Sequence, residues 1–386
     1  MKQMMSKNQV SIVGASVAGL LAATEAAERG IETTVYEEHR EIGLPEKCDG
    51  LVSAKGMSEL GLVPPANIVQ NHPTKAVFFS PSKKEIRIDA HRQNVVVLDR
   101  ARFDRYLAEK ALRAGAKIEL GRRVSKTLQT PVRAQLKIDS NDVESEVILD
   151  CSGHESYIRS GGETLQGGLY LVQGNWFEKS TVEVYFDPKA APGFFYWVIP
   201  IADDIAKIGI AGSEVNTFSA LDEFVERMKA RPLRKMAAPV VCSGTLRQFV
   251  DGRIARAGDA AGQAKPTTGG GIYTGGFGGA LAGIATAEAV QKKSIRYLEN
   301  YELNWKEKFG REFRLQYLAR NAFSKMSSEQ IDKLFEMIGS SEIPRLISEE
   351  GDFDRHSVAI TKAFGFSNSL SALGMLFSNE LRNLLS

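Results

Sequence analysis

Apolar and polar positions alternate along the chain with periods that predict a mixed α/β protein. Residues 9–13 form an apolar run, followed by the glycine-rich hexapeptide GASVAG at residues 14–19 and a helix of small residues. Gly30 ends this helix, and a second apolar run at residues 31–36 stops at Glu37. The order of strand, glycine turn, helix and strand is typical of the βαβ unit of a Rossmann-like sheet.

Short alternating runs predict a second sheet, largely antiparallel, that is inserted into the first. Residues 116–120 and 147–149 are expected to return to the first sheet, after an amphipathic helix that opens at Asp99. The runs assigned to the second sheet lie at residues 75–80, 84–90, 94–98, 168–173, 181–186, 194–201 and 205–211.

The periodicity becomes helical from residue 294 onward, and the final part, residues 361–385, is amphipathic. This tail is expected either to pack on the body of the protein or to touch lipid. Aromatic side chains recur in the helical region at spacings that are mostly four, which is more often a core stripe than a ligand site. They are Tyr297, Tyr301, Trp305, Phe309, Phe313 and Tyr317.

Composition narrows the class of protein. A chain of 386 residues is long enough for two or three domains, and a net charge of +2 gives no broad field for nucleic acid. Cys48, Cys151 and Cys242 are far apart and odd in number, and neither they nor the five histidines have metal-ligand spacing. We therefore expect no metal, no disulfide framework and a reducing, cytoplasmic setting.

The first βαβ unit predicts a dinucleotide site. Glycines at Gly14 and Gly19 allow a tight turn and close helix packing, and Glu37 lies where an acid can accept hydrogen bonds from ribose hydroxyls. Ser16 replaces the middle glycine of the usual pattern, but it is small and its hydroxyl can reach a phosphate. A strand, turn and helix that arose by chance would rarely have both the glycines and the acid at this spacing.

A second glycine-rich stretch, GDAAGQAKPTTGGGI at residues 258–272, follows a strand-like run. Asp259 at a strand end can accept hydrogen bonds from sugar-like hydroxyls. The glycines at residues 269–271 let the backbone approach a flat ligand, and the helix after them directs free N–H groups toward it. The alternative is a tight turn before a packing helix.

Taken in order, these segments resemble the geranylgeranyl reductase family of FAD enzymes, over roughly residues 8–320. The carrying motifs are GASVAG with Glu37, EIGLPEKCDG, DRARFDRYL, DCSGHESYIR, PGFFYWVIP and GDAAG…PTTGGGI. The resemblance implies an FAD-binding domain of the aromatic-hydroxylase type at residues 8–75, 99–160 and 245–295. It further implies a substrate-binding domain at residues 76–98 and 161–244, and a helical region at residues 296–386.

The resemblance also implies roles for individual residues. Cys48 is expected to act at the flavin ring, where the alternative is an inert buried thiol, and Arg100 to reach FAD instead of being a solvated charge. Tyr196 and Trp197 belong to one strand, so only one of their side chains can face the cavity for the prenyl chain. The residues implied to contact FAD are Gly14, Ser16, Ala18, Gly19, Glu37, Glu38, Cys48, Asp49, Arg100, Val124, Asp259, Gly270, Gly271 and Ile272. Those implied to contact substrate are Pro192, Gly193, Tyr196 and Trp197.

The expected activity is FAD-dependent reduction of isoprenoid double bonds, most naturally in the geranylgeranyl chains of a membrane lipid or its precursor. Asp49, Leu51 and Ser152 depart from the family pattern and bear on substrate and redox tuning. A flavin monooxygenase and a non-catalytic FAD-containing lipid carrier are the alternatives. With one dinucleotide unit visible, NAD(P)H or ferredoxin is expected as a transient electron donor, and peripheral membrane contact accompanies a lipid substrate.

Overall fold

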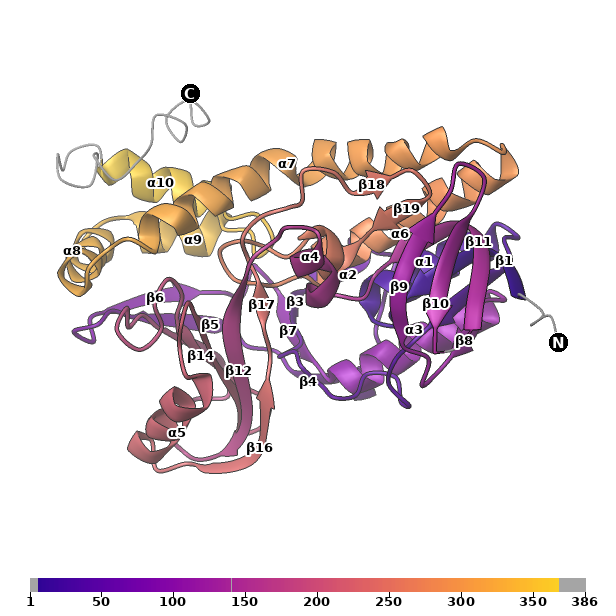
Figure 1. Cartoon of the computed structure of the whole chain (residues 1–386). Helices are drawn as coiled ribbons and strands as arrows, with labels where there is room; N and C mark the ends of the chain where they lie inside the picture. The colour runs from indigo at the N-terminus through magenta and orange to yellow at the C-terminus, as the bar shows by residue number, and fades with distance from the viewer. Residues whose placement is uncertain (1–5, 140, 368–386) are drawn as a thin grey trace.

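The computed structural model describes residues 6–139 and 141–367, which form two large sheets, a small third sheet and a set of C-terminal helices (Figure 1). The predicted tail at residues 361–385 falls mostly outside the described residues. Among those that are described, no helix is both long and apolar enough to cross a membrane.

The first sheet has parallel strands at its centre, in the order β19, β11, β1, β2 and β8. Its strands carry Val, Ile and Leu at buried positions, as expected for a sheet covered on both faces. The carboxyl ends of the parallel strands meet at one edge, where ligands bind in such sheets. The bounds are β1 (Ser6–Val13), β2 (Thr33–Tyr36), β8 (Lys117–Glu119), β9 (Val124–Gln129), β10 (Ala134–Ile138), β11 (Asn141–Asp150), β18 (Val250–Asp251) and β19 (Ile254–Arg256).

Helices α1 (Val17–Glu28) and α6 (Ile272–Gln291) pack closely against one another beside this sheet. Glycine permits the contact, because a Cβ on Gly279 would lie 2.1 Å from the carbonyl oxygen of Ala18. The first residues of both helices consequently reach the same cavity. The other helices of this half are α2 (Ala54–Glu59), α3 (Arg100–Arg113) and α4 (His154–Arg159).

The second sheet is ordered β16, β12, β15, β14, β13, β5 and β6, and all its neighbours are antiparallel except β13 and β5. One expectation fails here: β7 (Val95–Leu98) pairs with β3 (Leu51–Ser53) and β4 (Val69–Asn71) in the small sheet, not with the second sheet. The bounds are β5 (Lys75–Phe79), β6 (Glu85–Asp89), β12 (Thr164–Gln173), β13 (Thr181–Tyr185), β14 (Tyr196–Pro200), β15 (Ile205–Gly212), β16 (Arg231–Ala237) and β17 (Val240–Val241).

Helices cover both faces of the second sheet (Figure 1). Helix α5 (Thr217–Arg227) packs on one face, and α8 (Ser328–Gly339) and α9 (Ile343–Glu350) contact β6 at its far edge. The long helix α7 (Leu298–Phe323) runs from the first half of the molecule to the second, and α10 (Ser357–Ser367) contacts it. Four of the six aromatic residues of the predicted stripe are buried as expected for core, namely Tyr301, Trp305, Phe309 and Phe313, whereas Tyr297 and Tyr317 are half-buried.

Candidate functional site

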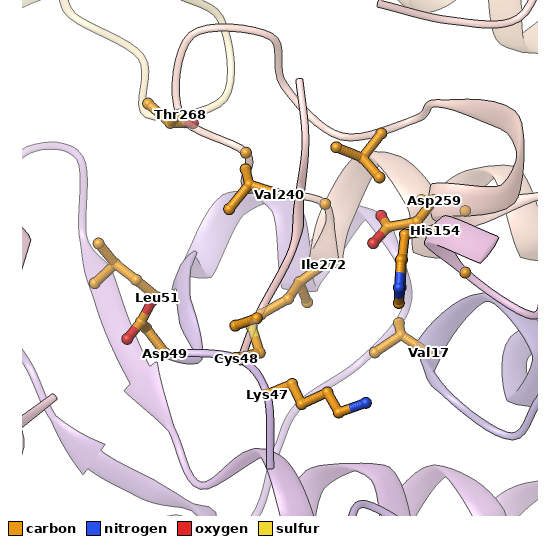
Figure 2. Close-up of a pocket in the computed structure, with 18 of the residues that line it drawn as sticks. Val17, Lys47, Cys48, Asp49, Leu51, His154, Val240, Asp259, Thr268 and Ile272 are labelled. Atoms are coloured by element: carbon orange, nitrogen blue, oxygen red, sulfur yellow. The ribbon is translucent and has the colours of Figure 1, made fainter. Parts of the chain in front are cut away.

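A cavity of about 1450 Å³ lies where the carboxyl ends of the first sheet meet the inner face of the second. Its wall combines the two glycine-rich segments, the loop around Cys48 and strands of the second sheet. In Figure 2, Cys48 and Asp49 line one side, Ile272 comes from the start of α6, and Asp259 lies near His154. The sequence motifs, dispersed over the chain from residue 14 to residue 272, thus converge on one space.

The turn after β1 has the geometry of a phosphate site. Gly14 has φ of +95°, and a Cβ there would lie 2.6 Å from the carbonyl oxygen of Cys151, so only glycine fits. Ser16 is the N-cap of α1 but makes no side-chain capping bond, which leaves its hydroxyl and the helix N-terminus open to the cavity. Glu37 accepts a 2.8 Å hydrogen bond from the amide of Ala15, which fixes the acid beside this turn.

The second glycine segment places an acid beside the start of α6. Asp259 is open to the cavity although protein surrounds it on most sides, and burial raises its pKa while His154 and Arg100 lower it. A Cβ on Gly271 would lie 3.1 Å from Oδ1 of Asp259, so glycine keeps this corner free for a ligand. Helix α6 starts at Ile272 without a side-chain cap.

The loop around Cys48 is held by Arg100 of α3. Nη2 of Arg100 donates hydrogen bonds of 3.1 and 3.2 Å to Asp104, and Cys48 lies close enough to influence the charge of the guanidinium. Burial opposes the charge of Arg100, but Asp104 and then Cys48 outweigh it and raise the pKa. Only 12 % of the Arg100 side chain is exposed. Arg100 is therefore an ion-paired residue in the wall of the cavity and not a solvated charge.

A buried polar network, missed at the sequence level, ties this loop to the second sheet. Nζ of Lys207 donates to Oε1 of Glu46 at 2.9 Å and to the carbonyl oxygen of Asp49 at 3.1 Å. Arg234 donates to the other oxygen of Glu46 at 2.6 Å, and Trp197 donates its indole N–H to Oδ2 of Asp49 at 2.8 Å. A single lysine in the apolar run IAKIGIAG of β15 was the signal that could have found it.

The far half of the cavity is apolar and lies between the second sheet and the C-terminal helices. Aliphatic and aromatic side chains of alternate strand positions face it, together with side chains near the end of α7 and on α8 and α9. These helical contributions were also missed, because the periodicity gave only a core stripe. The wall includes Phe78, Ile86, Ile88, Val182, Val184, Phe186, Phe195, Ile199, Phe323, Met326, Leu334, Phe335, Ile338 and Ile347.

Most residues singled out from the sequence lie on this cavity, and three do not. Tyr196 packs behind the sheet, where its ring stacks on Phe224 of α5 at 5.4 Å, whereas Trp197 faces the cavity. Pro192 packs beside Gly212, and Gly19 packs under Gly14, whose oxygen would lie 2.0 Å from a Cβ on Gly19. Those on the wall are Gly14, Ser16, Ala18, Glu37, Glu38, Cys48, Asp49, Arg100, Val124, Gly193, Trp197, Asp259, Gly270, Gly271 and Ile272.

A loop between α9 and α10 closes the cavity beside the glycine segment. Nζ of Lys265 donates to the carbonyl oxygen of Phe353 at 2.7 Å and to Oδ1 of Asp354 at 3.1 Å. Nδ1 of His356 and Oγ1 of Thr267 are 2.6 Å apart, and both residues line the cavity. Burial and the charge of Lys265 lower the pKa of His356 to about 4.

These features fit FAD. The helix N-terminus at Ser16 suits a pyrophosphate, Glu37 suits the adenosine ribose and Asp259 suits ribityl hydroxyls. The spaces that a Cβ on Gly14 or Gly271 would fill are the close approaches that such a ligand needs.

The comparisons with known proteins agree with this geometry. A family model described as an FAD binding domain matches residues 7–178. Digeranylgeranylglycerophospholipid reductase 2 of Methanopyrus kandleri is 30 % identical, covering 88 % of this chain and 93 % of the relative. Reductase 1 of the same organism is 31 % identical, covering 78 % and 86 %.

Solved structures add evidence for the fold. A geranylgeranyl bacteriochlorophyll reductase-like protein from Thermoplasma acidophilum superposes with a TM-score of 0.83 at 23 % identity, covering 96 % of this chain and 100 % of that one. The flavin-dependent brominase Bmp2 superposes with a TM-score of 0.68 at 17 % identity, covering 96 % and 100 %. The predicted α/β flavoprotein fold and the predicted FAD cofactor are confirmed.

Proposed function

This chain belongs to the digeranylgeranylglycerophospholipid reductase family, and we propose that it reduces isoprenoid double bonds in the geranylgeranyl chains of a lipid or lipid precursor. The observation that carries the proposal is the two-part cavity. Its glycine-lined end fits FAD, and its other end is an apolar channel between the second sheet and helices α7, α8 and α9. A long hydrocarbon chain is the ligand that such a channel buries at least cost.

The proposed roles of the cavity residues follow from their positions. FAD, when bound and reduced, supplies the hydride that an isolated double bond cannot take from a weaker donor. Arg100 and Cys48 form the wall beside the ring site, and Cys48 is proposed to shape the pocket or to handle a proton there. Trp197 lines the cavity and contacts the loop of Cys48 through Asp49, and its proposed role is to shield the double bond from water.

Electron supply and membrane contact belong to the same proposal. FAD must be re-reduced after each turnover, and NAD(P)H or ferredoxin is the proposed donor because both dock transiently. A lipid substrate reaches the apolar channel from a membrane, so the proposal includes peripheral contact with a lipid surface.

The test is direct. Protein that carries FAD is reduced with dithionite and mixed anaerobically with a geranylgeranyl lipid. The mass of the lipid product is then measured by mass spectrometry. Gain of hydrogen pairs with reoxidation of the flavin is the expected result. Product hydroxylation that requires oxygen would indicate a monooxygenase, and flavin that no prenyl lipid reoxidises would indicate a lipid carrier; either result refutes the proposal.

A further inference from the structure

Asp49 has one carboxylate oxygen that nothing in the described part of the chain satisfies. Its Oδ2 accepts the 2.8 Å hydrogen bond from the indole N–H of Trp197. Its Oδ1 is buried and has no hydrogen-bond partner among the described residues. The residue as a whole is half-buried and lines the cavity, where it lies between Cys48 and Leu51 (Figure 2).

The cationic side chains around Asp49 form salt bridges with other acids. Lys207 of β15 approaches only its backbone oxygen and directs its charge at Glu46, which Arg234 of β16 also pairs. Arg100 of α3 is paired with Asp104. No cation therefore forms a salt bridge with the Asp49 carboxylate among the described residues.

The balance of these effects moves the pKa of Asp49 upward, toward neutral pH. Burial raises the pKa of Asp49 most, Lys207 and the hydrogen bond from Trp197 lower it, and the charge of Glu46 raises it again; the result is about 6. A carboxyl with a pKa of about 6 is protonated in about one molecule in ten at pH 7, and this fraction can act as a general acid.

We infer that Asp49 donates the proton that completes reduction of the double bond, an inference that rests on the proposed function. FAD, when bound and reduced, would supply the hydride to one carbon of the double bond, and the carboxyl of Asp49, which lines the cavity, gives its proton to the other. The hydride carries the two electrons of the flavin into the first C–H bond, and the π electron pair forms the second. The carboxylate of Asp49 then regains a proton from water. Trp197 holds the acid in place and stabilises the carboxylate that is left.

Neighbouring geometry supports this assignment over Cys48 as the proton source. Cys48 lies close to the charge of Arg100, whereas the carboxylate of Asp49 forms no salt bridge among the described residues. Gly209 faces Trp197 across the strand pair, and a Cβ there would lie 2.1 Å from the indole ring. Glycine at this position therefore leaves room for the indole, whose N–H reaches Asp49.

The decisive variant is Asp49→Asn, which keeps an oxygen for Trp197 and removes the acid. Protein carrying prereduced FAD is mixed with a geranylgeranyl lipid, and flavin reoxidation is followed from pH 5 to 8. The wild-type rate should fall about tenfold per pH unit above a pKa of about 6, and the variant should be slower by about 10²–10⁴-fold without that pH limb. Asp203→Asn, on the exposed turn after β14, is the matched control and should change neither the reoxidation rate nor its pH dependence.

A readout independent of turnover uses the indole. In protein without FAD, tryptophan fluorescence should titrate near pH 6, and this titration should vanish in Asp49→Asn and Trp197→Phe. If Asp49→Asn does not fold, Trp197→Phe decides, because loss of a hydrogen bond that lowers the pKa should move the rate limb to higher pH. Wild-type rates and pH profile in Asp49→Asn, or an unmoved limb in Trp197→Phe, overturn the inference. A wild-type protein that no prenyl lipid reoxidises instead refutes the proposed function itself.

Discussion

Nζ of Lys207 lies 2.9 Å from Oε1 of Glu46, and only 3 % and 9 % of these two side chains are exposed. The pair joins a strand of the second sheet to the loop that carries Cys48, although 161 residues separate its members. Burial raises the pKa of Glu46, but Lys207 and Arg234 outweigh it, so the pKa is lowered and the carboxylate stays charged. The wall between the two ends of the cavity is thus anchored by charge.

Lys207→Met should cost about 3–5 kcal/mol in the free energy of unfolding, because it leaves a buried carboxylate short of a partner. Urea denaturation measures it. Lys235→Met is the control, since Lys235 pairs with Asp222 on the surface and its loss should cost far less. Similar costs for the two variants would show that the buried pair has no special role.

Asp259→Ala should weaken FAD binding by about 1.5–3 kcal/mol, because ribityl hydroxyls lose a charged acceptor. Fluorescence titration with FAD measures it, and Asp251→Ala, an exposed acid of β18, is the control. Purified wild-type protein should be yellow. A colourless protein that stays free of FAD in excess cofactor would contradict the whole assignment.

Tyr196→Ala and Trp197→Ala should differ in kind, because the two side chains face opposite sides of β14. Tyr196 packs on Phe224, so its loss should lower stability by about 3–5 kcal/mol and leave the turnover of folded protein nearly unchanged. Trp197 lines the cavity, and its loss should chiefly lower turnover of long prenyl substrates. Melting temperature and single-turnover rate together separate the two outcomes, and equal effects would argue for a plain core strand.

Cys48→Ala should keep FAD and fold but slow reoxidation of prereduced flavin, because the thiol shapes the pocket beside the ring site; a loss on the order of 10²–10⁴-fold would instead show that the thiol and not Asp49 gives the proton. Cys48→Ser should recover little, since a hydroxyl is a far weaker acid. Cys242→Ala is the control: its thiol is fully buried, and burial raises its pKa to about 11. A Cys48→Ala protein that retains the pH limb assigned to Asp49 separates the two residues, and wild-type speed would show that Cys48 is only packing.

Acidification should loosen the loop between α9 and α10. The pKa of His356 is lowered in the folded protein, so its contribution to stability is present above the usual value of 6.5 and is lost progressively as pH falls from there to about 4. Urea midpoints at pH 7.5 and 5 should differ less in His356→Gln than in wild type, whereas exposed His91→Gln should change nothing. Parallel pH profiles of wild type and His356→Gln would contradict this.

The sequence by itself determined the parts that depend on near neighbours in the chain. GASVAG with Glu37 specified a strand, a turn, a helix and an acid within one short segment, and Gly14 has the positive φ that such a turn requires. The stretch from Gly258 to Ile272 likewise placed an acid before a glycine-capped helix. Local sterics and helix geometry fix these features, so they could be predicted.

Only the tertiary structure decided which faces and which distant charges meet. Strand alternation predicted that Tyr196 and Trp197 diverge, but the packing of α5 on one face decided which of them lines the cavity. The Lys207–Glu46 pair and the contact of Trp197 with Asp49 connect segments that are 161 and 148 residues apart. Such contacts produce no periodic pattern in the sequence, because the burial of a charge or an indole depends on which distant segments pack around it.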